Sequence, residues 1–586
     1  MTRIASARNA QDYRPMFVWG DSSALKAAPV FRVCFAAATL LTTILPLSLP
    51  PELIDGDVEP PSLLARPISL PNNHHLPRPP PIMGAAVHLP DHIWFQIVQY
   101  LPALAVRDLY SVNSALFNIA MNVRYRQMSF AYLDNRMIRN LVRLKDPEVA
   151  KRVKVLHVYP GFLQETFDRE KATPPLQRTL RYCLTDIANH LREQKLLPKN
   201  LNLSKLGLIR TLRRPEDMIR LMLDVLGALP NVSDYYVTWC GLPGLGPSAA
   251  SILSTVFHSD VRKLSLDISL ENVQSLTQSM WLIRHLEELH LCIHYDYTDA
   301  LTSREEIFRK HVAPAINHHR KTLKRLLLQS WEPRDMSQLF YAIEHLPALD
   351  MLSVSIPVES PHLGNPEGLT NFLNRHSSTL KSLRLRATQF GGAGLNPDPI
   401  SFDYWIQNAL KGVTLHKLRT LDISSGLFPV ETALSCLTHF SRSLTTVCIT
   451  GHYRSYEDVE EILDILQRVP RERSLEKLRL GSVSLSPQLL DLLAASLPSL
   501  RTLELVVRDL LPHALDVPLY FRGGHIRAFD ETQTVDFFTE MKTHKYPYWH
   551  LRRMSLVVDA LPSRTYYEQR LEKLFRTCIP SITTFT

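Results

Sequence analysis

The sequence lacks the short motifs that mark most catalytic, nucleotide-binding and metal-binding sites. It contains no HExxH, no GxSxG and no CxxC pair, although it has seven cysteines. The glycines at 241–246 and 391–394 do not match a phosphate loop or a dinucleotide-binding turn. Histidines gather at 285–294 and 311–319, but a metal site needs more donors at defined spacings. We therefore expect a protein that is not an enzyme and has neither a metal site nor a cofactor.

Disulfide pairing and a basic nucleic-acid surface are also poorly supported. An odd number of isolated cysteines is typical of free thiols in a reducing compartment. The net charge of +9 arises between Arg124 and Arg214, where 20 basic residues face 8 acidic ones. No nucleic-acid-binding motif accompanies this surplus, so we interpret it as solvated helix faces. We expect no nucleic-acid partner.

Residues 1–86 differ in composition from the rest of the chain. Thirteen of the 41 prolines precede Met83, and closely spaced prolines prevent continuous helix or sheet. We predict a disordered, proline-rich leader with one apolar stretch at 30–45. That stretch is shorter than the roughly twenty residues of a membrane-spanning helix, so we expect no membrane partner. A membrane anchor, a signal-like segment, a disordered apolar stretch and a non-native extension of the reading frame all remain open.

A unit of the form L-x-x-L-x-L recurs along the C-terminal part of the chain. Clear copies begin at Val261, Leu286, Leu323, Leu349, Leu380, Leu418, Leu444, Leu475, Leu500 and Leu551. Weaker copies lie near Val153, near Val232 and at the C-terminal end. The alternation within each unit predicts a short strand with one buried face. Helical patterns such as VEEILDILQRVP and LLDLLAASLP separate the units.

Strands that alternate with helices predict an α/β fold with a parallel sheet. One repeat cannot bury its apolar face alone, so neighbouring repeats must stack. The pattern resembles irregular leucine-rich repeats over residues 131–586. The resemblance implies a curved solenoid with parallel strands on the concave side and helices on the convex side.

Residues 87–130 form a second, smaller unit. Within it, LPDHIWFQIVQYLPALAVRDLYSVNSALFNIA at 89–120 spaces its apolar residues at helical steps of three and four. A segment this short cannot close a core alone and needs a partner. It resembles an F-box, the helical module that joins substrate receptors to ubiquitin ligases. The linker YRQMSFAYLDNRMIRNLVRLKDPEVAKRVKVLHVYPGF resembles that of fungal F-box proteins, in which a strand, a helix and a strand begin the solenoid.

The F-box resemblance implies a Skp-type adaptor as partner and, through it, a cullin. Eight residues would contact the adaptor or hold the helices together: Leu89, Pro90, Ile93, Ile97, Leu101, Leu109, Val112 and Leu116. The chain would then be the substrate-recognition subunit of an SCF-type E3 ubiquitin ligase in the cytoplasm or nucleus, with an unidentified protein as its substrate. Two alternatives remain open: a leucine-rich-repeat scaffold without a ligase role, and a helical segment that only caps the solenoid.

Insertions in solenoids often lie on the binding face. The longest interruption here, between Leu510 and His550, contains PLYFRGGHIRAFD and HKYPYWH. Aromatic residues and arginine often anchor protein interfaces. We therefore predict substrate contacts at Tyr520, Phe521, Arg522, Tyr548 and Trp549. The alternative is that these aromatic residues fill a local core beneath a loop.

Overall fold

The structure of the chain is a computed structural model. It describes residues 89–101, 105–106, 109–132, 134–161, 215–239, 257, 260–270, 272–273, 279–294, 304–331, 336–357, 363–388, 398–424, 430–451, 453–468, 474–514, 531–558 and 564–586. All of these belong to one compact unit, residues 88–586. The predicted leader at 1–86, including the apolar stretch at 30–45, lies outside the described residues.

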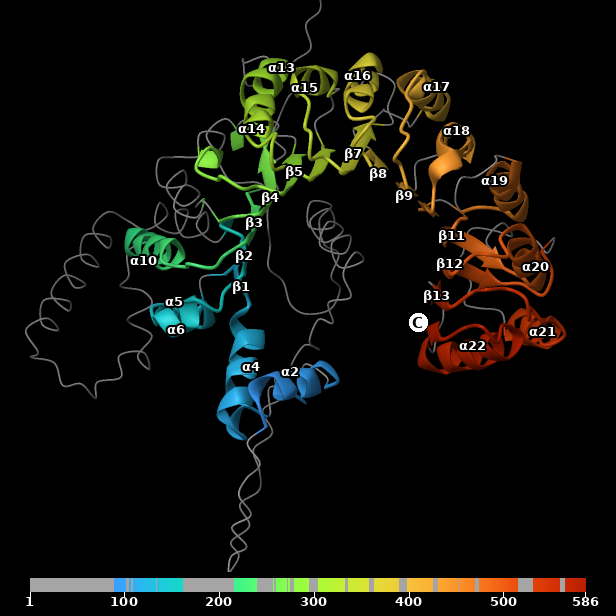
Figure 1. The fold of residues 1–586 in the computed structure, drawn as a ribbon, viewed down its shortest axis with the longest axis horizontal. Coiled ribbons are helices and arrows are strands. Elements are labelled where there is room, and N and C mark those ends of the chain that lie inside the picture. The colour runs from blue at the N-terminus through green and yellow to red at the C-terminus, as the bar shows by residue number, and fades with distance from the viewer. Residues whose placement is uncertain are drawn as a thin grey trace, which may run out of the picture. The chain divides into compact units, whose positions relative to one another are not determined.

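In the described part of the chain, fourteen parallel strands form one sheet in which sequence order equals spatial order (Figure 1). The strands are β1 (Gln127–Phe130), β2 (Val155–Val158), β3 (Asp234–Thr238), β4 (Lys263–Ser269), β5 (Glu288–His294), β6 (Arg325–Ser330), β7 (Met351–Pro357), β8 (Ser382–Thr388), β9 (Thr420–Ser424), β10 (Thr446–Thr450), β11 (Lys477–Leu485), β12 (Thr502–Leu510), β13 (Arg553–Val558) and β14 (Thr584–Phe585). Each strand from β2 to β13 pairs with the strand before it and the strand after it, while β1 and β14 stand at the two edges. This topology is that of a leucine-rich-repeat solenoid.

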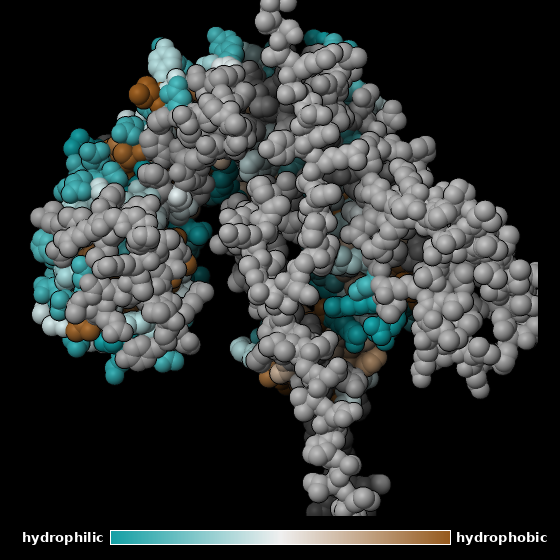
Figure 2. Space-filling model, turned by 180° about the vertical axis from the view of Figure 1, so that it is seen from behind, coloured by the Kyte–Doolittle hydropathy of each residue, from teal (hydrophilic) through white to brown (hydrophobic). Residues whose placement is uncertain are grey.

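Helices occupy most of the connections between strands. They are α2 (Asp91–Gln99), η1 (Leu109–Ser111), α4 (Ser114–Tyr125), α5 (Asn135–Leu144), α6 (Pro147–Ala150), α10 (Pro215–Gly227), α13 (Arg304–Ile307), η3 (Phe308–Val312), α14 (Ala313–His318), α15 (Ser337–Ala342), α16 (Glu367–Arg375), α17 (Pro399–Leu410), α18 (Val430–Phe440), η5 (Ser441–Ser443), α19 (Tyr456–Arg468), α20 (Pro487–Ser496), α21 (Glu531–Met541) and α22 (Arg564–Cys578). From α13 onward they follow the outer side of the curved sheet (Figure 1). Seen from behind, the described surface toward the C-terminal end is largely hydrophilic with scattered hydrophobic patches (Figure 2).

The leucines of the repeat unit build the core between strands and helices. In the unit that begins at Leu475, Leu478 and Leu480 belong to β11, and all three leucines are buried. Residues between them, such as Lys477 and Arg479, fall on the opposite face because side chains alternate along a strand. The ten clear repeat units coincide with β4 to β13, and the weaker copies with β2, β3 and β14. The sequence prediction of a parallel repeat sheet is therefore confirmed.

The sheet begins earlier than residue 131, where the sequence pattern placed the solenoid. β1 starts at Gln127, and the expected strand–helix–strand linker is β1, α5 and β2. Tyr125, Met128 and Phe130 belong to the same buried cluster as the repeats. The last residues of the predicted helical module are thus part of the solenoid core, because the first repeat needs an apolar neighbour to cover its end.

A buried histidine links two consecutive repeats. His376 follows α16 and has no solvent-exposed surface. Its Nδ1 lies 2.7 Å from the carbonyl oxygen of Phe372, and its Nε2 lies 2.9 Å from the amide nitrogen of Leu346. The ring must donate to the carbonyl and accept from the amide, which fixes it as the neutral tautomer. Burial lowers the pKa of His376 to about 4.

His319 stands in the same place of another repeat, four residues before the first leucine of its unit, as His376 does. It is 2% exposed, and the ring of His318 packs against it edge-on. Burial lowers the pKa of His319 to about 4, and the neighbouring charge of His318 acts in the same direction. Two repeats therefore each hold a neutral imidazole beneath the strand layer.

Gly368 allows the close approach of α15 and α16. A Cβ at this position would lie 2.7 Å from Cα and 2.8 Å from the carbonyl oxygen of Ser337, closer than side chains come to a backbone. We expect Gly368→Ala to lower the free energy of unfolding by about 1–3 kcal/mol, because the two helices must separate to admit the methyl group. Chemical denaturation measures this loss. Gly161→Ala is the control, since nothing lies within 4 Å of its Cβ position; equal stability of both variants would contradict the prediction.

Cysteines in the described part of the chain agree with the prediction of free thiols. Cys292, Cys436, Cys448 and Cys578 are buried and form no disulfide. Burial raises the pKa of Cys436 to about 12, so this thiol stays protonated and packs as a small apolar side chain. No helix among the described residues has the length and apolar character to cross a membrane.

Candidate functional site

The helix α2 is the least covered of the elements that were expected to bind a partner. It starts directly after Pro90, whose carbonyl oxygen accepts a hydrogen bond from the Ile93 amide at 2.9 Å. Proline suits this position because it does not have to donate a backbone hydrogen bond. The nine residues of α2 include apolar Ile93, Trp94, Phe95, Ile97 and Val98, yet none of the nine is buried.

The eight predicted adaptor-binding residues divide by burial. Leu89, Ile93, Leu101 and Leu109 are half-buried, and Pro90 is exposed. Ile97 and Val112 are 39% and 60% exposed, so their apolar surfaces face solvent. Leu116 is only 2% exposed and holds α4 in place, the structural role allowed for some members of this set.

Four further exposed residues of this region were not among those predicted. Phe95, Tyr100, Phe117 and Val123 present apolar or aromatic surface, and Tyr100 is 88% exposed. Steps of three and four favour the residues that face a helix's own neighbours. Phe95, Tyr100 and Phe117 fall between those steps, and Val123 lies beyond the segment 89–120. The sequence could have indicated these four residues, because the region contains more apolar residues than one face of a helix can bury.

In contrast to α2, α4 is firmly attached to the first repeat. Asn113 caps its N-terminus by accepting a hydrogen bond from the Leu116 amide at 2.8 Å. At its side, the guanidinium of Arg152 donates to the Asn118 carbonyl at 3.1 Å, to the Asn118 side chain at 3.0 Å and to the Asn122 side chain at 2.6 Å. Since Arg152 lies between α6 and β2, these bonds tie α4 to the start of the solenoid. α4 is therefore fixed to the first repeat.

The predicted substrate-binding residues do not form one cluster in the described structure. Tyr520, Phe521 and Arg522 lie outside the described residues. Tyr548 is 87% exposed, whereas Trp549 is 3% exposed and belongs to the buried core. The indole nitrogen of Trp549 donates to the Leu497 carbonyl at 3.0 Å. Trp549 is therefore a core residue without surface for a partner, because the segment 544–549 turns its indole toward α20.

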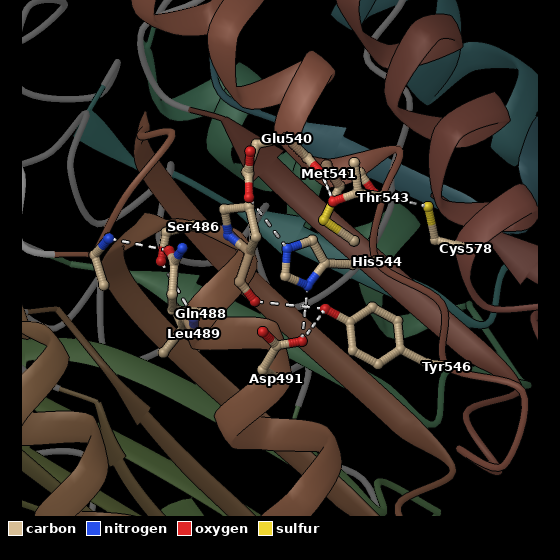
Figure 3. A network of polar contacts seen from close by, with 12 residues as sticks. Ser486, Gln488, Leu489, Asp491, Glu540, Met541, Thr543, His544, Tyr546 and Cys578 are labelled. Atoms are coloured by element: carbon tan, nitrogen blue, oxygen red, sulfur yellow. Dashed lines mark hydrogen bonds and ion pairs between the residues drawn. The ribbon is translucent and has the colours of Figure 1, made fainter.

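A polar network holds that segment against α20 and α21 (Figure 3). The carboxylate of Asp491 accepts a hydrogen bond from the Tyr546 hydroxyl at 2.8 Å and lies 3.1 Å from His544 Nδ1. His544 Nε2 lies 3.6 Å from the Glu540 carboxylate. Burial, followed by the Asp491 carboxylate, raises the pKa of Tyr546. The network is a structural clamp that ties the segment leading into Tyr548 and Trp549 to α20 and α21.

Every second side chain of a strand points away from the helices, toward the inner face of the sheet. On this face, polar and charged side chains of neighbouring strands lie next to one another. Opposite charges alternate across neighbouring strands. Glu288 pairs with Lys263 at 2.6 Å and with Arg325 at 2.9 Å, while Asp422 pairs with Arg384 at 2.9 Å and with Arg386 at 2.8 Å. These pairs neutralise the cations they involve. The described inner face is therefore polar without being a simple basic surface.

Three possible metal ligands meet on this face between β4 and β5. The ligand atoms of Asp267, Cys292 and His294 all lie within 4.8 Å of one another. His294 Nε2 contacts the Asp267 carboxylate, and the Cys292 sulfur lies 3.6 Å from the same imidazole nitrogen. Burial raises the pKa of the Cys292 thiol, and the hydrogen bond to His294 opposes this shift. His290, on the same face, lies 3.1 Å from the Ser265 hydroxyl and is engaged there.

Comparisons with known proteins leave the family open. No family model matches the chain, and no curated protein matches it. One solved structure that it resembles is the crystal structure of the Rad7 and Elc1 complex in yeast, with 14% sequence identity and a TM-score of 0.35. The match covers 72% of this chain and 90% of that chain. At this TM-score the likeness supports no conclusion about fold or partner, so the fold assignment rests on the strand pairing itself.

Proposed function

We propose that this chain is the substrate-recognition subunit of an SCF-type E3 ubiquitin ligase. In this proposal an F-box at 87–130 docks a Skp-type adaptor, which connects the chain to a cullin in the cytoplasm or nucleus. The leucine-rich repeats hold a protein substrate. The chain itself breaks no bond. Holding the substrate beside the conjugating enzyme raises the effective concentration of its lysines near the ubiquitin to be transferred.

The difference in burial between α2 and α4 is the observation that supports the proposal best. A helical cap on the first repeat would need α4, because Leu116 and Ala120 of α4 are buried and a side chain of α4 accepts a hydrogen bond from Arg152. The cap does not require the uncovered apolar residues of α2, since none of them is buried. Exposed apolar residues that cluster on one element mark an interaction site. The resemblance of the segment to an F-box identifies the adaptor as the occupant we propose.

The adaptor test uses the full chain and a purified Skp-type adaptor. We expect Ile97→Ala and Leu101→Ala each to weaken capture at least tenfold, because each removes an apolar anchor from the proposed interface. A tenfold loss corresponds to about 1.4 kcal/mol. Titration with immobilised adaptor measures the affinity.

Ile400→Ala is the matched control, because Ile400 is 82% exposed on α17 and lies outside the proposed interface. It should bind like the unaltered chain. Undiminished capture by the Ile97 and Leu101 variants would contradict the proposal.

A repeat scaffold without ligase function is the second candidate. The observation in its favour is the bonding of α4 to Arg152, because it gives the N-terminal helices a structural role that needs no adaptor. Affinity purification of the cellular complexes separates the two candidates. Adaptor and cullin should co-purify if the chain is a ligase receptor, and neither should co-purify if it is a scaffold.

A further inference from the structure

Two features of the sheet bring Asp267, Cys292 and His294 together. Cys292 and His294 are separated by one residue on β5, so their side chains project from the same face. The parallel register pairs Asp267 of β4 directly with Cys292 and pairs Ser269 with His294. The carboxylate therefore comes from one repeat and the thiol and imidazole from the next. All three side chains are partly or largely shielded, with Cys292 buried.

We propose that Asp267, Cys292 and His294 bind a divalent transition-metal ion of the zinc type on the inner face of the solenoid. A thiolate, an imidazole and a carboxylate form a donor set that favours such ions over magnesium or calcium, which prefer oxygen ligands. On binding, the metal–sulfur bond forms as the Cys292 thiol gives its proton to solvent. The thiolate and the carboxylate then balance the two charges of the ion.

The surroundings of the three ligands suit a fixed site. β4 and β5 are held in continuous register from Lys263 and Glu288 to Ser269 and His294, so the backbone positions of the ligands are set by the sheet. The side chain of Trp331, which follows β6, acts against the burial that raises the pKa of Cys292 and so favours its thiolate. Three protein ligands leave the fourth tetrahedral position to a water molecule. The site lies on the polar inner face and would join two repeats, independently of any adaptor at α2.

Cobalt(II) is the probe for the test, because a thiolate bound to this ion gives a charge-transfer absorption band. The full chain, stripped of metal with a chelator, is titrated with cobalt and then with zinc. We expect the band to appear with one equivalent of cobalt and to disappear as zinc displaces it. Cys292→Ser should abolish the band, and His294→Gln and Asp267→Asn should each weaken cobalt binding at least tenfold.

Cys448→Ser is the control, because Cys448 is a buried thiol on β10, outside the site. It should leave the titration unchanged. Circular dichroism establishes that each variant is folded, and the His294 and Asp267 variants decide the matter if Cys292→Ser does not fold. A wild-type chain without the band, or a band that survives in folded Cys292→Ser, would overturn the proposal and leave an ion pair between Asp267 and His294 beside an ordinary thiol.

Discussion

The protein is expected to lose about 3 kcal/mol of its free energy of unfolding for each of two buried histidines as the pH falls from 6.5 to 4. In the folded chain the pKa of His319 and the pKa of His376 are each lowered from 6.5 to about 4. Between these values the unfolded chain binds protons that the folded chain excludes, so acid favours unfolding. The contribution is complete above pH 6.5, declines through this window and is lost below pH 4.

Denaturant midpoints measured from pH 7.5 to pH 4 test this prediction. His376→Gln should reduce the acid loss by about half, since its amide stays neutral and can accept from Leu346. The variant will be less stable at neutral pH, so the slope with pH is the relevant quantity. His285→Gln serves as the control because His285 is exposed. Identical slopes for the wild type and His376→Gln between pH 6.5 and pH 4 would show that the buried imidazole is not responsible.

Trp549→Ala is expected to lower the free energy of unfolding by about 3–5 kcal/mol. The substitution removes a buried indole, leaves a cavity beside α20 and removes one of the hydrogen bonds to the Leu497 carbonyl, which keeps the bond from the Leu500 amide. It also removes the edge-on packing between the rings of Trp549 and Tyr546, whose centres lie 5.9 Å apart. Trp549→Phe should cost less, because it keeps most of the apolar volume and loses mainly the hydrogen bond.

The neighbouring residue provides the matched control for this experiment. Tyr548→Ala removes an aromatic ring of similar size from an exposed position and should change stability by less than about 0.5 kcal/mol. Thermal unfolding and chemical denaturation of the three variants measure the differences. Equal losses at 548 and 549 would mean that the polar clamp around Asp491 does not orient this segment as described.

The repeat pattern was sufficient to predict the sheet, because each strand depends on its own leucines and on neighbours built in the same way. The repeat pattern did not show that Tyr548 is exposed and Trp549 is buried. The burial of Trp549 goes with its hydrogen bond to Leu497, 52 positions earlier, and Tyr546 nearby is bonded to Asp491, 55 positions earlier. The burial of Trp549 shows that aromatic composition alone does not identify a binding surface.

The candidate sites were less predictable for a related reason. Helical spacing suggested Ile97 and Val112, but the exposure of Phe95 and Tyr100 depends on how α2 lies against α4. The histidines around β5 were visible in the sequence as a group without enough metal donors. The missing carboxylate belongs to Asp267 on the preceding strand, and its place beside Cys292 follows only from the register.

The sequential order of the fourteen strands has a consequence for how the protein is made and pulled apart. Every strand can join the sheet as soon as it leaves the ribosome, because its partner has already been synthesised. Each described strand then forms the open edge of the sheet until the next strand pairs with it. Under mechanical load on its two ends the same array should release its repeats one after another, from the ends inward, since each is held by its immediate neighbours.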